Sequence, residues 1–375
     1  MKIWTALTVL LAAAALAACG GSSSSASSPQ PTSASPAASP SGELATLIEG
    51  ARKEGQLTLS WSDKTVGSSA TFAQYADAFN KLYGLNLKVE FTPADSMPAM
   101  AAKVAQEVQA GRPASSDLFL GTAENLRDML QVKAIQSVDW ASWAPNIKDP
   151  ALVEPNGYGV NVASLLPGIA YNSSKLKGDA VPRTLEDLLQ PRFKGHIAST
   201  TYAAQFNRLA APELWGEQKT VDYVTKLSEQ VSGLIRCGEQ ERIASGEFDL
   251  LALDCGGDAD RLKAQGAPVD HVIPTDAPMY FSWDLALPAN SAHPNAAKLW
   301  VNFIMSRQGQ DLVYKDAFAD NAFLPGSHIA PQLDQLKASG AKLVKTDLDF
   351  YQRNDPAKLK AISQQLQSIL AKKKS

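Results

Sequence analysis

Hydrophobic positions recur with two periods along the chain from residue 57 onward. The run Leu-Thr-Leu-Ser-Trp at residues 57–61 alternates with a period of two and predicts a half-buried strand. Residues 71–83 place apolar side chains three and four positions apart and end at Gly84, which predicts an amphipathic helix. Further strands are predicted at residues 87–91, 117–120, 196–199, 233–236, 249–254 and 269–273. Further helices are predicted at residues 98–110, 123–130, 202–214, 217–230, 239–245, 258–265, 295–305, 307–314, 331–339 and 356–372.

Strands and helices alternate in two separate blocks, at residues 57–130 and 196–273. A strand–helix–strand order predicts a parallel, doubly wound sheet with right-handed connections. The segment at residues 145–176, between the blocks, is richer in Pro, Gly and Asn. The pattern therefore predicts an α/β fold with two units of similar architecture and no internal sequence repeat.

The pattern at residues 1–18 predicts a signal peptide. Lys2 supplies one positive charge, and residues 5–18 are almost wholly apolar or small. An apolar core this short matches a secretory signal rather than a helix that spans a bilayer. The run ends Leu-Ala-Ala-Cys at Cys19, which resembles a bacterial lipobox and implies cleavage before Cys19 and lipid attachment to its sulfur. The alternative is a plain secretory peptide with an accidental cysteine.

Residues 19–42 are predicted to form a disordered tether behind the lipid. They are mostly Ser, Pro, Ala and Thr, with no charge and no large apolar side chain. Such a segment cannot bury enough surface to offset chain entropy. Two or three acyl chains would hold the protein stably on a membrane, so we expect an extracytoplasmic protein anchored to the cell membrane. The folded part is expected to begin at about Glu43.

Composition narrows the class of protein further. The chain has 375 residues, of which 45% are hydrophobic and 19% charged, a length that suits two domains. A net charge of -3 argues against a nucleic-acid binder, which usually carries a basic domain. Once Cys19 is assigned to lipid, Cys237 and Cys255 remain as an even pair in an oxidising compartment.

Cys237 and Cys255 each follow a predicted strand, and one predicted helix separates those strands. We expect the two strands to be neighbours in a sheet, with both cysteines at carboxyl ends. A disulfide between them is therefore predicted, and it would contribute roughly 3 kcal/mol in the chain-entropy model. The alternative is a pair of unbonded buried cysteines.

Several stretches share an order and spacing with one known family. They read Gly-Ile-Ala-Tyr-Asn-Ser-Ser-Lys-Leu (168–176), Pro-Arg-Thr-Leu-Glu-Asp-Leu-Leu-Gln-Pro-Arg-Phe-Lys-Gly-His-Ile (182–197), Ser-Gly-Glu-Phe-Asp (245–249), Gly-Ala-Pro-Val (266–269), Leu-Ala-Leu (285–287), His-Pro-Asn-Ala-Ala-Lys-Leu-Trp (293–300) and Ser-Arg-Gln-Gly-Gln (306–310). Together they resemble the type II periplasmic binding proteins, in the branch that binds ferric iron and small solutes. Each piece also has a local role; Thr184, for example, is a plausible helix N-cap with Asp187 at the third helical position.

The resemblance implies two doubly wound α/β lobes joined by hinge strands, with the ligand in a cleft that closes by hinge bending. It places crossings near residues 160–171, 280–285 and 318–323. Lobe 1 would then comprise residues 43–165 and 282–318, and lobe 2 residues 166–281 and 319–375. The implied function is that of a monomeric substrate-binding component of an ABC importer, which passes a small solute to permease subunits.

Candidate ligand-binding residues follow from a general rule about open parallel sheets. Ligands bind beyond the carboxyl ends of the strands, where the next helix presents unpaired N–H groups and a partial positive charge. Applied to the predicted strands and the second crossing, the rule selects Ser60, Trp61, Ser62, Gly121, Thr122, Ser199, Thr200, Cys237, Gly238, Cys255, Gly256, Tyr280 and Trp283.

The candidate residues leave the charge of the ligand open. Hydroxyl and glycine residues at helix N-termini suit an anionic head group, and Trp61, Tyr280 and Trp283 would supply flat apolar walls. Asp63 and Asp284, beside these aromatic residues, instead suit a cationic amine. We favour an organic anion such as a carboxylate or phosphonate, with a polyamine or other cationic amine as the alternative.

The sequence departs from the ferric-binding members at the metal site. Those proteins usually carry two adjacent tyrosines after the strand that matches residues 249–254, where this chain reads Asp-Cys-Gly-Gly at residues 254–257. No metal-ligand spacing is present among the four histidines, His196, His271, His293 and His328. We therefore expect no metal site and no cofactor.

An extracellular hydrolase is a rival class. The chain lacks Gly-x-Ser-x-Gly, His-Glu-x-x-His and a Walker glycine loop. The Ser-x-x-Lys match at residues 339–342 lacks the accompanying Lys-Thr-Gly, because residues 345–347 read Lys-Thr-Asp. We therefore do not expect an enzyme. A ligand-sensing lipoprotein that reports to a membrane receptor would share the fold and stays a second alternative.

Overall fold

The computed structural model of this chain describes residues 42–372. The expected signal peptide, the lipid attachment at Cys19 and the tether up to residue 41 lie outside the described residues. Residues 40–375 belong to one compact unit. Between residues 42 and 372, no helix combines the length and apolar character needed to cross a bilayer.

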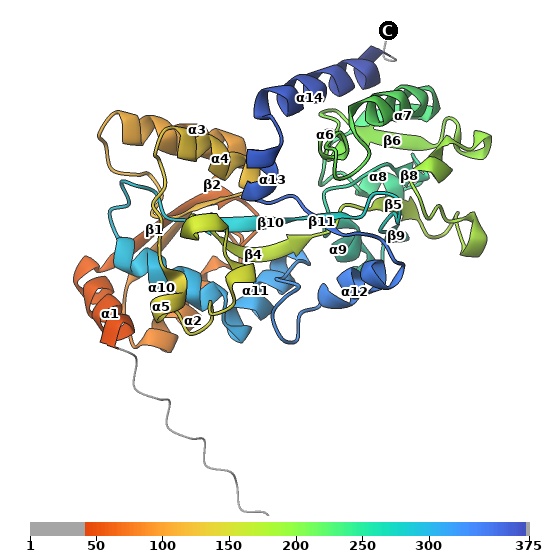
Figure 1. Ribbon diagram of the computed structural model, residues 1–375. Coiled ribbons are helices and arrows are strands. Elements are labelled where there is room, and N and C mark those ends of the chain that lie inside the picture. Colours follow the sequence, from red (N-terminus) through yellow and green to blue (C-terminus); the bar gives the residue numbers. More distant parts are fainter. Residues whose placement is uncertain (1–41, 373–375) are drawn as a thin grey trace, which may run out of the picture. The chain divides into compact units, whose positions relative to one another are not determined.

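The first lobe contains the N-terminal α/β block together with two helices from later in the chain (Figure 1). Strands β1 and β2 pair in parallel, and α10 packs against α1, α2 and β1. The elements of this lobe are α1 (Gly42–Glu54), β1 (Gln56–Ser62), α2 (Phe72–Tyr83), β2 (Lys88–Ala94), α3 (Met97–Gln109), β3 (Phe119–Gly121), α4 (Ala123–Gln131), α5 (Trp140–Trp143), β4 (Val160–Leu165), α10 (Pro294–Ile304) and α11 (Arg307–Ala317).

An aromatic cluster fills the core of the first lobe. Phe72 stacks on Trp300 with 5.5 Å between ring centroids, and Phe79 lies 5.1 Å from the same indole. Trp61 is 1% exposed, and its indole N–H donates to the Val66 carbonyl at 3.0 Å. Because each ring buries a large apolar area while the polar indole nitrogen of Trp61 is satisfied, the cluster holds α2 and α10 against β1.

The second lobe is a five-stranded mixed sheet with the strand order β7-β6-β8-β5-β9. Strand β6 runs parallel to β7 and β8, whereas β5 runs antiparallel to β8 and β9. Helix α7 buries Tyr223, Val224 and Leu227 against this sheet. The elements are β5 (Ile169–Asn172), β6 (Ile197–Thr200), α6 (Phe206–Leu209), α7 (Glu217–Gln230), β7 (Val231–Ile235), α8 (Glu241–Ala244), β8 (Leu250–Leu251), α9 (Asp258–Ala264) and β9 (Val269–Val272).

Strand β10 (Met279–Ala286) connects the two lobes. It pairs antiparallel with β3 and β4 and parallel with β11 (Val344–Lys345). Met279 lies in the hydrophobic cluster of the second lobe, and Leu285 lies in the main cluster of the first. The register with β4 shifts between Trp283 and Asp284, where β4 has one extra residue, Val162, so a β-bulge of β4 lies opposite the middle of β10.

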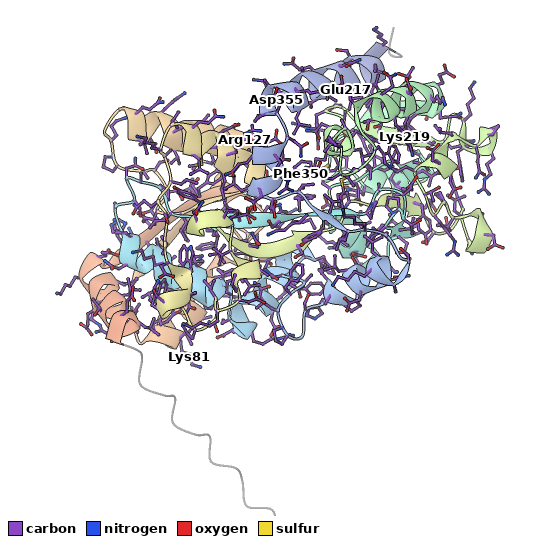
Figure 2. All side chains as sticks on the ribbon, in the orientation of Figure 1. Lys81, Arg127, Glu217, Lys219, Phe350 and Asp355 are labelled. Atoms are coloured by element: carbon purple, nitrogen blue, oxygen red, sulfur yellow. A yellow bond between two sulfur atoms is a disulfide. The ribbon has the colours of Figure 1, made fainter. Side chains whose placement is uncertain are left out.

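The C-terminal segment contacts both lobes. After α12 (Ala330–Ala338), α13 (Leu348–Arg353) packs on α4 of the first lobe, and Figure 2 shows Phe350 of α13 near Arg127 of α4. Helix α14 (Pro356–Ala371) then packs on α7, where Lys358 Nζ lies 2.8 Å from Glu217 Oε2. The expected assignment of residues 319–375 to lobe 2 therefore fails for α13, whose buried side chains lie in a cluster with α3 and α4.

The expectation of two α/β lobes is confirmed, but a purely parallel sheet is wrong. Long-range crossings bring β4, β5 and β10 into the sheets as antiparallel strands, which local periodicity does not reveal. The helix expected at residues 202–214 shrinks to α6, because Ala203 and Gln205 adopt positive φ. The strand expected at residues 249–254 shrinks to β8, because Leu253 also has positive φ.

Cys237 and Cys255 form a disulfide with 5.9 Å between their Cα atoms. The strands that precede them, β7 and β8, are not neighbours as expected, because β6 lies between them. The bond therefore spans the carboxyl end of β6 and ties together the two strands on either side of it.

The disulfide is predicted to stabilise the fold by lowering the conformational entropy of the unfolded chain. A double variant with Cys237→Ala and Cys255→Ala should lose about 3 kcal/mol of unfolding free energy, measured by urea titration, because the bond closes a loop of intermediate length. Reducing the wild type should produce the same loss. Rapid alkylation of both thiols in the native, unreduced protein, seen by intact mass, would contradict the bond.

Candidate ligand-binding site

A tight loop at residues 201–205 follows β6, an inner strand of the second lobe's sheet. Thr200 Oγ1 accepts a hydrogen bond from the Ala204 backbone N–H at 2.7 Å. Ala203 and Gln205 have φ values of 51° and 67°, which side chains other than glycine rarely adopt. Backbone strain of this kind persists where surrounding contacts fix it, and it concentrates at functional sites.

The disulfide and the loop hold each other in place. The backbone N–H of Cys237 donates to the Tyr202 hydroxyl at 2.9 Å, and Gln205 Nε2 lies 3.9 Å from Cys255 Sγ. Thr200, Cys237 and Cys255, which the sequence selected from three different strands, therefore lie around one loop. Gly238 is exposed beside them.

Arg208 is a functional candidate that the sequence rule missed. It lies in α6 and is 6% exposed, and its Nε donates to the Tyr351 hydroxyl at 2.9 Å. The guanidinium carbon lies 4.4 Å from the centroid of the Phe281 ring, and Nη1 contacts Gln205 Oε1. Within residues 42–372 no carboxylate lies within ion-pair distance of Arg208.

A sequence signal for Arg208 existed. It is the one charged residue in the fifteen positions 198–212, immediately after a buried strand. A lone cation in an apolar segment is hard to bury without a counter-charge. The helix predicted at residues 202–214 concealed this signal, because a charged residue within a predicted helix is ordinarily assigned to its exposed face.

The candidate residues of the first lobe serve local roles in the structure. The Ser60 backbone N–H donates to Ser116 Oγ at 2.9 Å, and Trp61 belongs to the aromatic core. Gly121 pairs with Asp284 in the sheet, and Thr122 caps α4. Ser62 is half-buried at the end of β1. The link from this lobe toward Arg208 runs through Tyr351, which packs in one cluster with α3 and α4 side chains.

The remaining candidates lie on or beside the crossing strands. Tyr280 is 8% exposed, and its ring centroid lies 5.7 Å from that of Phe323. Trp283 packs partly buried against the first lobe's core. Gly256 lies close to the end of β4, since a Cβ there would sit 3.5 Å from Leu165 Cβ. Ser199 is fully buried within β6, and its hydroxyl has no hydrogen-bond partner among the described residues.

Both acids that suggested a cationic ligand already have partners. Asp63 Oδ1 accepts hydrogen bonds from the Ser69 backbone N–H at 2.8 Å and from the Ser69 hydroxyl at 3.3 Å. Asp284 is fully buried and accepts a hydrogen bond from Asn161 Nδ2. None of these hydrogen bonds joins either carboxylate to the loop at residues 201–205.

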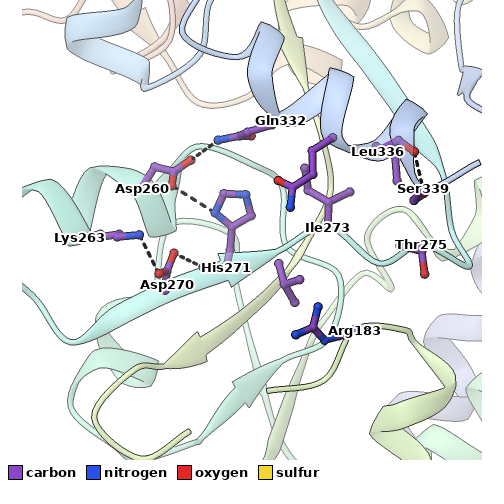
Figure 3. A pocket seen from close by; sticks show the side chains of 12 residues that line it. Arg183, Asp260, Lys263, Asp270, His271, Ile273, Thr275, Gln332, Leu336 and Ser339 are labelled. Carbon is purple, nitrogen blue, oxygen red and sulfur yellow. Dashed lines mark hydrogen bonds and ion pairs between the residues drawn. The ribbon is translucent and has the colours of Figure 1, made fainter. Parts of the chain in front are cut away.

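A cavity of about 410 Å³ lies beside the edge strand β9, between α9 and α12 (Figure 3). Asp260, Asp270 and His271 line it and bring three possible metal-ligating atoms within 4.8 Å of one another. Asp270 pairs with Lys263 at 2.7 Å, and His271 Nδ1 lies 3.2 Å from Asp260 Oδ1. The two carboxylates are thus balanced within the cluster, and none of the residues that line the cavity belongs to the loop at residues 201–205.

The fold and the strand-end arrangement define a two-lobed α/β binding protein of the type II periplasmic class. The family model described as "Bacterial extracellular solute-binding protein" matches residues 116–354, more than half of the chain. The chain therefore belongs to the bacterial extracellular solute-binding protein family, and the resemblance inferred from the sequence is confirmed.

Sequence relatives match over part of their length. An uncharacterized protein of Haemophilus influenzae is 29% identical over 168 residues, which cover 42% of this chain and 45% of the relative. The Fe(3+)-binding periplasmic protein of Serratia marcescens is 23% identical over 244 residues, which cover 62% of this chain and 71% of that protein. The chain thus spans less than half the length of the first of these relatives.

Solved structures share the fold at low identity. The substrate-binding protein of an ABC transporter from Agrobacterium tumefaciens has a TM-score of 0.67 at 17% identity, covering 85% of this chain and 96% of that one. Iron-bound HitA from Pseudomonas aeruginosa has a TM-score of 0.63 at 17% identity, covering 84% and 99%. AfuA from Actinobacillus pleuropneumoniae, with fructose-6-phosphate bound, has a TM-score of 0.57 at 21% identity, covering 85% and 97%. Since HitA is iron-bound and AfuA has fructose-6-phosphate bound, the fold alone does not fix the ligand.

Asp254, directly before Cys255, is predicted to make stability depend on pH. Complete burial raises its pKa to about 6, against the opposing effects of His271 and of hydrogen bonds from the Gly168 and Gly256 backbone N–H groups. A raised carboxyl pKa stabilises the fold below the unfolded pKa, and this contribution is lost as pH rises through the folded pKa.

Asp254→Asn should therefore be more stable than wild type above that pH by up to about 3 kcal/mol, and its stability should vary less with pH. Urea titrations across the acidic and neutral range measure both effects. Asp222→Asn, at an exposed acid on α7, is the matched control and should follow the wild type. Equal pH profiles for Asp254→Asn and wild type would refute the prediction.

Proposed function

We propose that this protein is the substrate-binding component of an ABC importer, which captures a small organic anion such as a carboxylate or phosphonate between its lobes. The ligand is held by hinge closure and passed to permease subunits without covalent chemistry. We further propose that lipid on Cys19 anchors a monomeric protein to the cell membrane from the extracytoplasmic side. The family membership supports the transport role, and Arg208 supports the anionic ligand.

Arg208 carries the argument for an anion. A buried guanidinium costs free energy unless its charge is balanced, and it has five N–H donors in a planar fork that matches carboxylate and phosphonate oxygens. Among the described residues, only the Tyr351 hydroxyl and Gln205 Oε1 accept hydrogen bonds from these donors. An anionic ligand would supply the missing counter-charge at the junction of the two lobes.

The surroundings of Arg208 favour a ligand with a flat part. The guanidinium stacks over Phe281 of the crossing strand, and Arg127 of the first lobe lies 5.5 Å from the Tyr351 ring. Two cations and two aromatic rings therefore surround the junction. The acids that would favour a polyamine, Asp63 and Asp284, are engaged elsewhere.

Closure of the lobes depends on a close backbone contact. Gly257 precedes α9 of the second lobe with a φ of 77°, and a Cβ there would sit 2.6 Å from the carbonyl oxygen of Ala317, at the end of α11 in the first lobe. Only glycine permits this approach. The contact supports a closed arrangement in which α9 meets α11.

Removing Arg208 should weaken anion binding. A thermal-shift screen of wild type against organic acids, phosphonates, polyamines and ferric iron should find an acid that raises the melting temperature by mass action. Arg208→Gln should lower the affinity for that ligand by about 10- to 100-fold, because a charge-assisted hydrogen bond is lost. Arg208→Lys should lower the affinity by less. Arg192→Gln, at an exposed arginine over Phe193, is the control and should bind normally.

Other outcomes of the screen are decisive as well. A melting-temperature shift with polyamines and with no acid would reject the anionic ligand while keeping the transport role. A hydrolytic activity without any binding response would reject the binding-protein function. Partner capture of a receptor instead of a permease would favour the sensor.

Gly257→Ala should weaken ligand binding by obstructing closure. The matched control is Gly266→Ala, because Gly266 has a similar φ of 85° but no atom within 4 Å of the position of a Cβ. Both variants pay a similar cost in backbone strain, about 1 kcal/mol, whereas only Gly257→Ala introduces a clash between lobes. Titration calorimetry with the screened acid should show weaker binding for Gly257→Ala alone; equal affinities would reject the contact as a closure point.

A further inference from the structure

Four polar side chains meet where the crossing strands lie side by side. We call them the hinge cluster: Glu154 from the segment before β4, Asn161 of β4, Asp284 of β10 and Lys345 of β11. Strand β10 pairs with both β4 and β11, so the cluster joins three strands at once. Asp284 sits directly at the β-bulge, where the pairing of β10 is already irregular.

The contacts of the hinge cluster centre on the Asn161 amide. Asn161 Nδ2 donates to Glu154 Oε1 at 2.8 Å and also to Asp284 Oδ1. Lys345 Nζ donates to Asn161 Oδ1 at 2.8 Å and lies 3.4 Å from Glu154 Oε1. Glu154 Oε2 accepts the Leu348 backbone N–H at 2.8 Å, which ties the start of α13 to the cluster.

The buried charges of the cluster do not balance when both acids are ionised. Glu154 is 1% exposed and Asp284 is fully buried, and the described residues offer no hydrogen-bond partner to Asp284 Oδ2. One lysine faces these two carboxylates. One proton on Asp284 makes the cluster neutral, whereas its loss leaves one uncompensated buried charge.

The other groups around Asp284 oppose this imbalance only in part. Burial and the Glu154 charge raise the pKa of Asp284 well above its ordinary value, while Lys345, Asn161 and Ser282 act in the opposite direction. Asp347 lies 3.9 Å from Lys345 and adds a further negative charge. Burial, Asp347 and Glu154 also raise the pKa of Tyr280, so this phenol stays neutral.

We propose that the hinge cluster is a proton-operated hinge, in which one proton on Asp284 holds β4, β10 and β11 together and favours the closed lobes. The proposal rests on the proposed function in one respect, which is that the protein works by closing its lobes. Loss of the proton places two like charges against one lysine inside the crossing strands. The strands then loosen at the bulge and the lobes separate, so ligand is held at lower pH and released at higher pH.

The experiment uses the purified full protein without any ligand, so its outcome is independent of which solute is bound. Small-angle X-ray scattering from about pH 5 to about pH 9 measures the radius of gyration, and urea titration measures the unfolding constant. Because a raised carboxyl pKa makes stability fall with rising pH, the wild-type unfolding constant should increase by at most about tenfold per pH unit, and the radius of gyration should increase over the same range.

Asp284→Asn keeps a neutral side chain of the same shape and should remove the expansion, leaving the compact form at all pH values. It should also reduce the pH dependence of the unfolding constant to the part that Asp254 contributes. Glu154→Gln leaves one acid opposite Lys345 and should remove the expansion as well; it decides the case if Asp284→Asn fails to fold. Asp77→Asn, at an exposed acid on α2, should behave like wild type.

Two results would overturn the hinge. In the first, wild type keeps one radius of gyration across the range, which leaves Asp284 a structural acid even where stability still depends on pH. In the second, Asp284→Asn or Glu154→Gln expands with pH as wild type does, which assigns the motion to other groups. Neither result bears on the anion proposal, which is tested through Arg208.

Discussion

Strand β10 is the element on which both lobes depend, because one continuous strand contributes to both hydrophobic cores. Met279 packs in the second lobe and Leu285 in the first, only six positions apart. Any movement of one lobe relative to the other must therefore bend this strand. The β-bulge opposite Trp283 and Asp284 interrupts the ladder at the place where bending costs least.

The candidate ligand-binding residues around Arg208 are also positioned by this shared strand. Phe281 of β10 provides a flat face for Arg208, while Tyr351, carried back to the first lobe by α13, accepts its Nε hydrogen bond. The disulfide and the strained loop at residues 201–205 position Gln205 and α6 from the other side. A buried cation held from both lobes, with no carboxylate beside it, is the basis of the proposal that an anionic solute binds when the lobes meet.

Opposite charges are distributed unequally over the same junction. On one side of β10, Arg208 is a buried cation without a carboxylate partner. In the hinge cluster, two carboxylates compete for Lys345. In both proposals the balancing charge comes from outside the protein, as an anionic ligand in the first case and a proton in the second. Solvent exclusion makes each imbalance strong enough to influence the conformation of the lobes.

The sequence by itself determined the α/β class, most helices of the lobes and the pairing of Cys237 with Cys255, because these rest on local periodicity, helix ends and the number of cysteines left after Cys19. It also placed Thr200, Cys237 and Cys255 at strand ends that the structure brings around one loop. Only the tertiary structure decided that β6 separates the strands of the disulfide, that Trp61 belongs to the core, and that α13 packs on the first lobe. The hinge cluster also emerged only there, because its members lie far apart along the chain. Arg208 stands out in the sequence as an isolated charge at residues 198–212, but its burial beside Tyr351 and Phe281 depends on long-range contacts that no local pattern records.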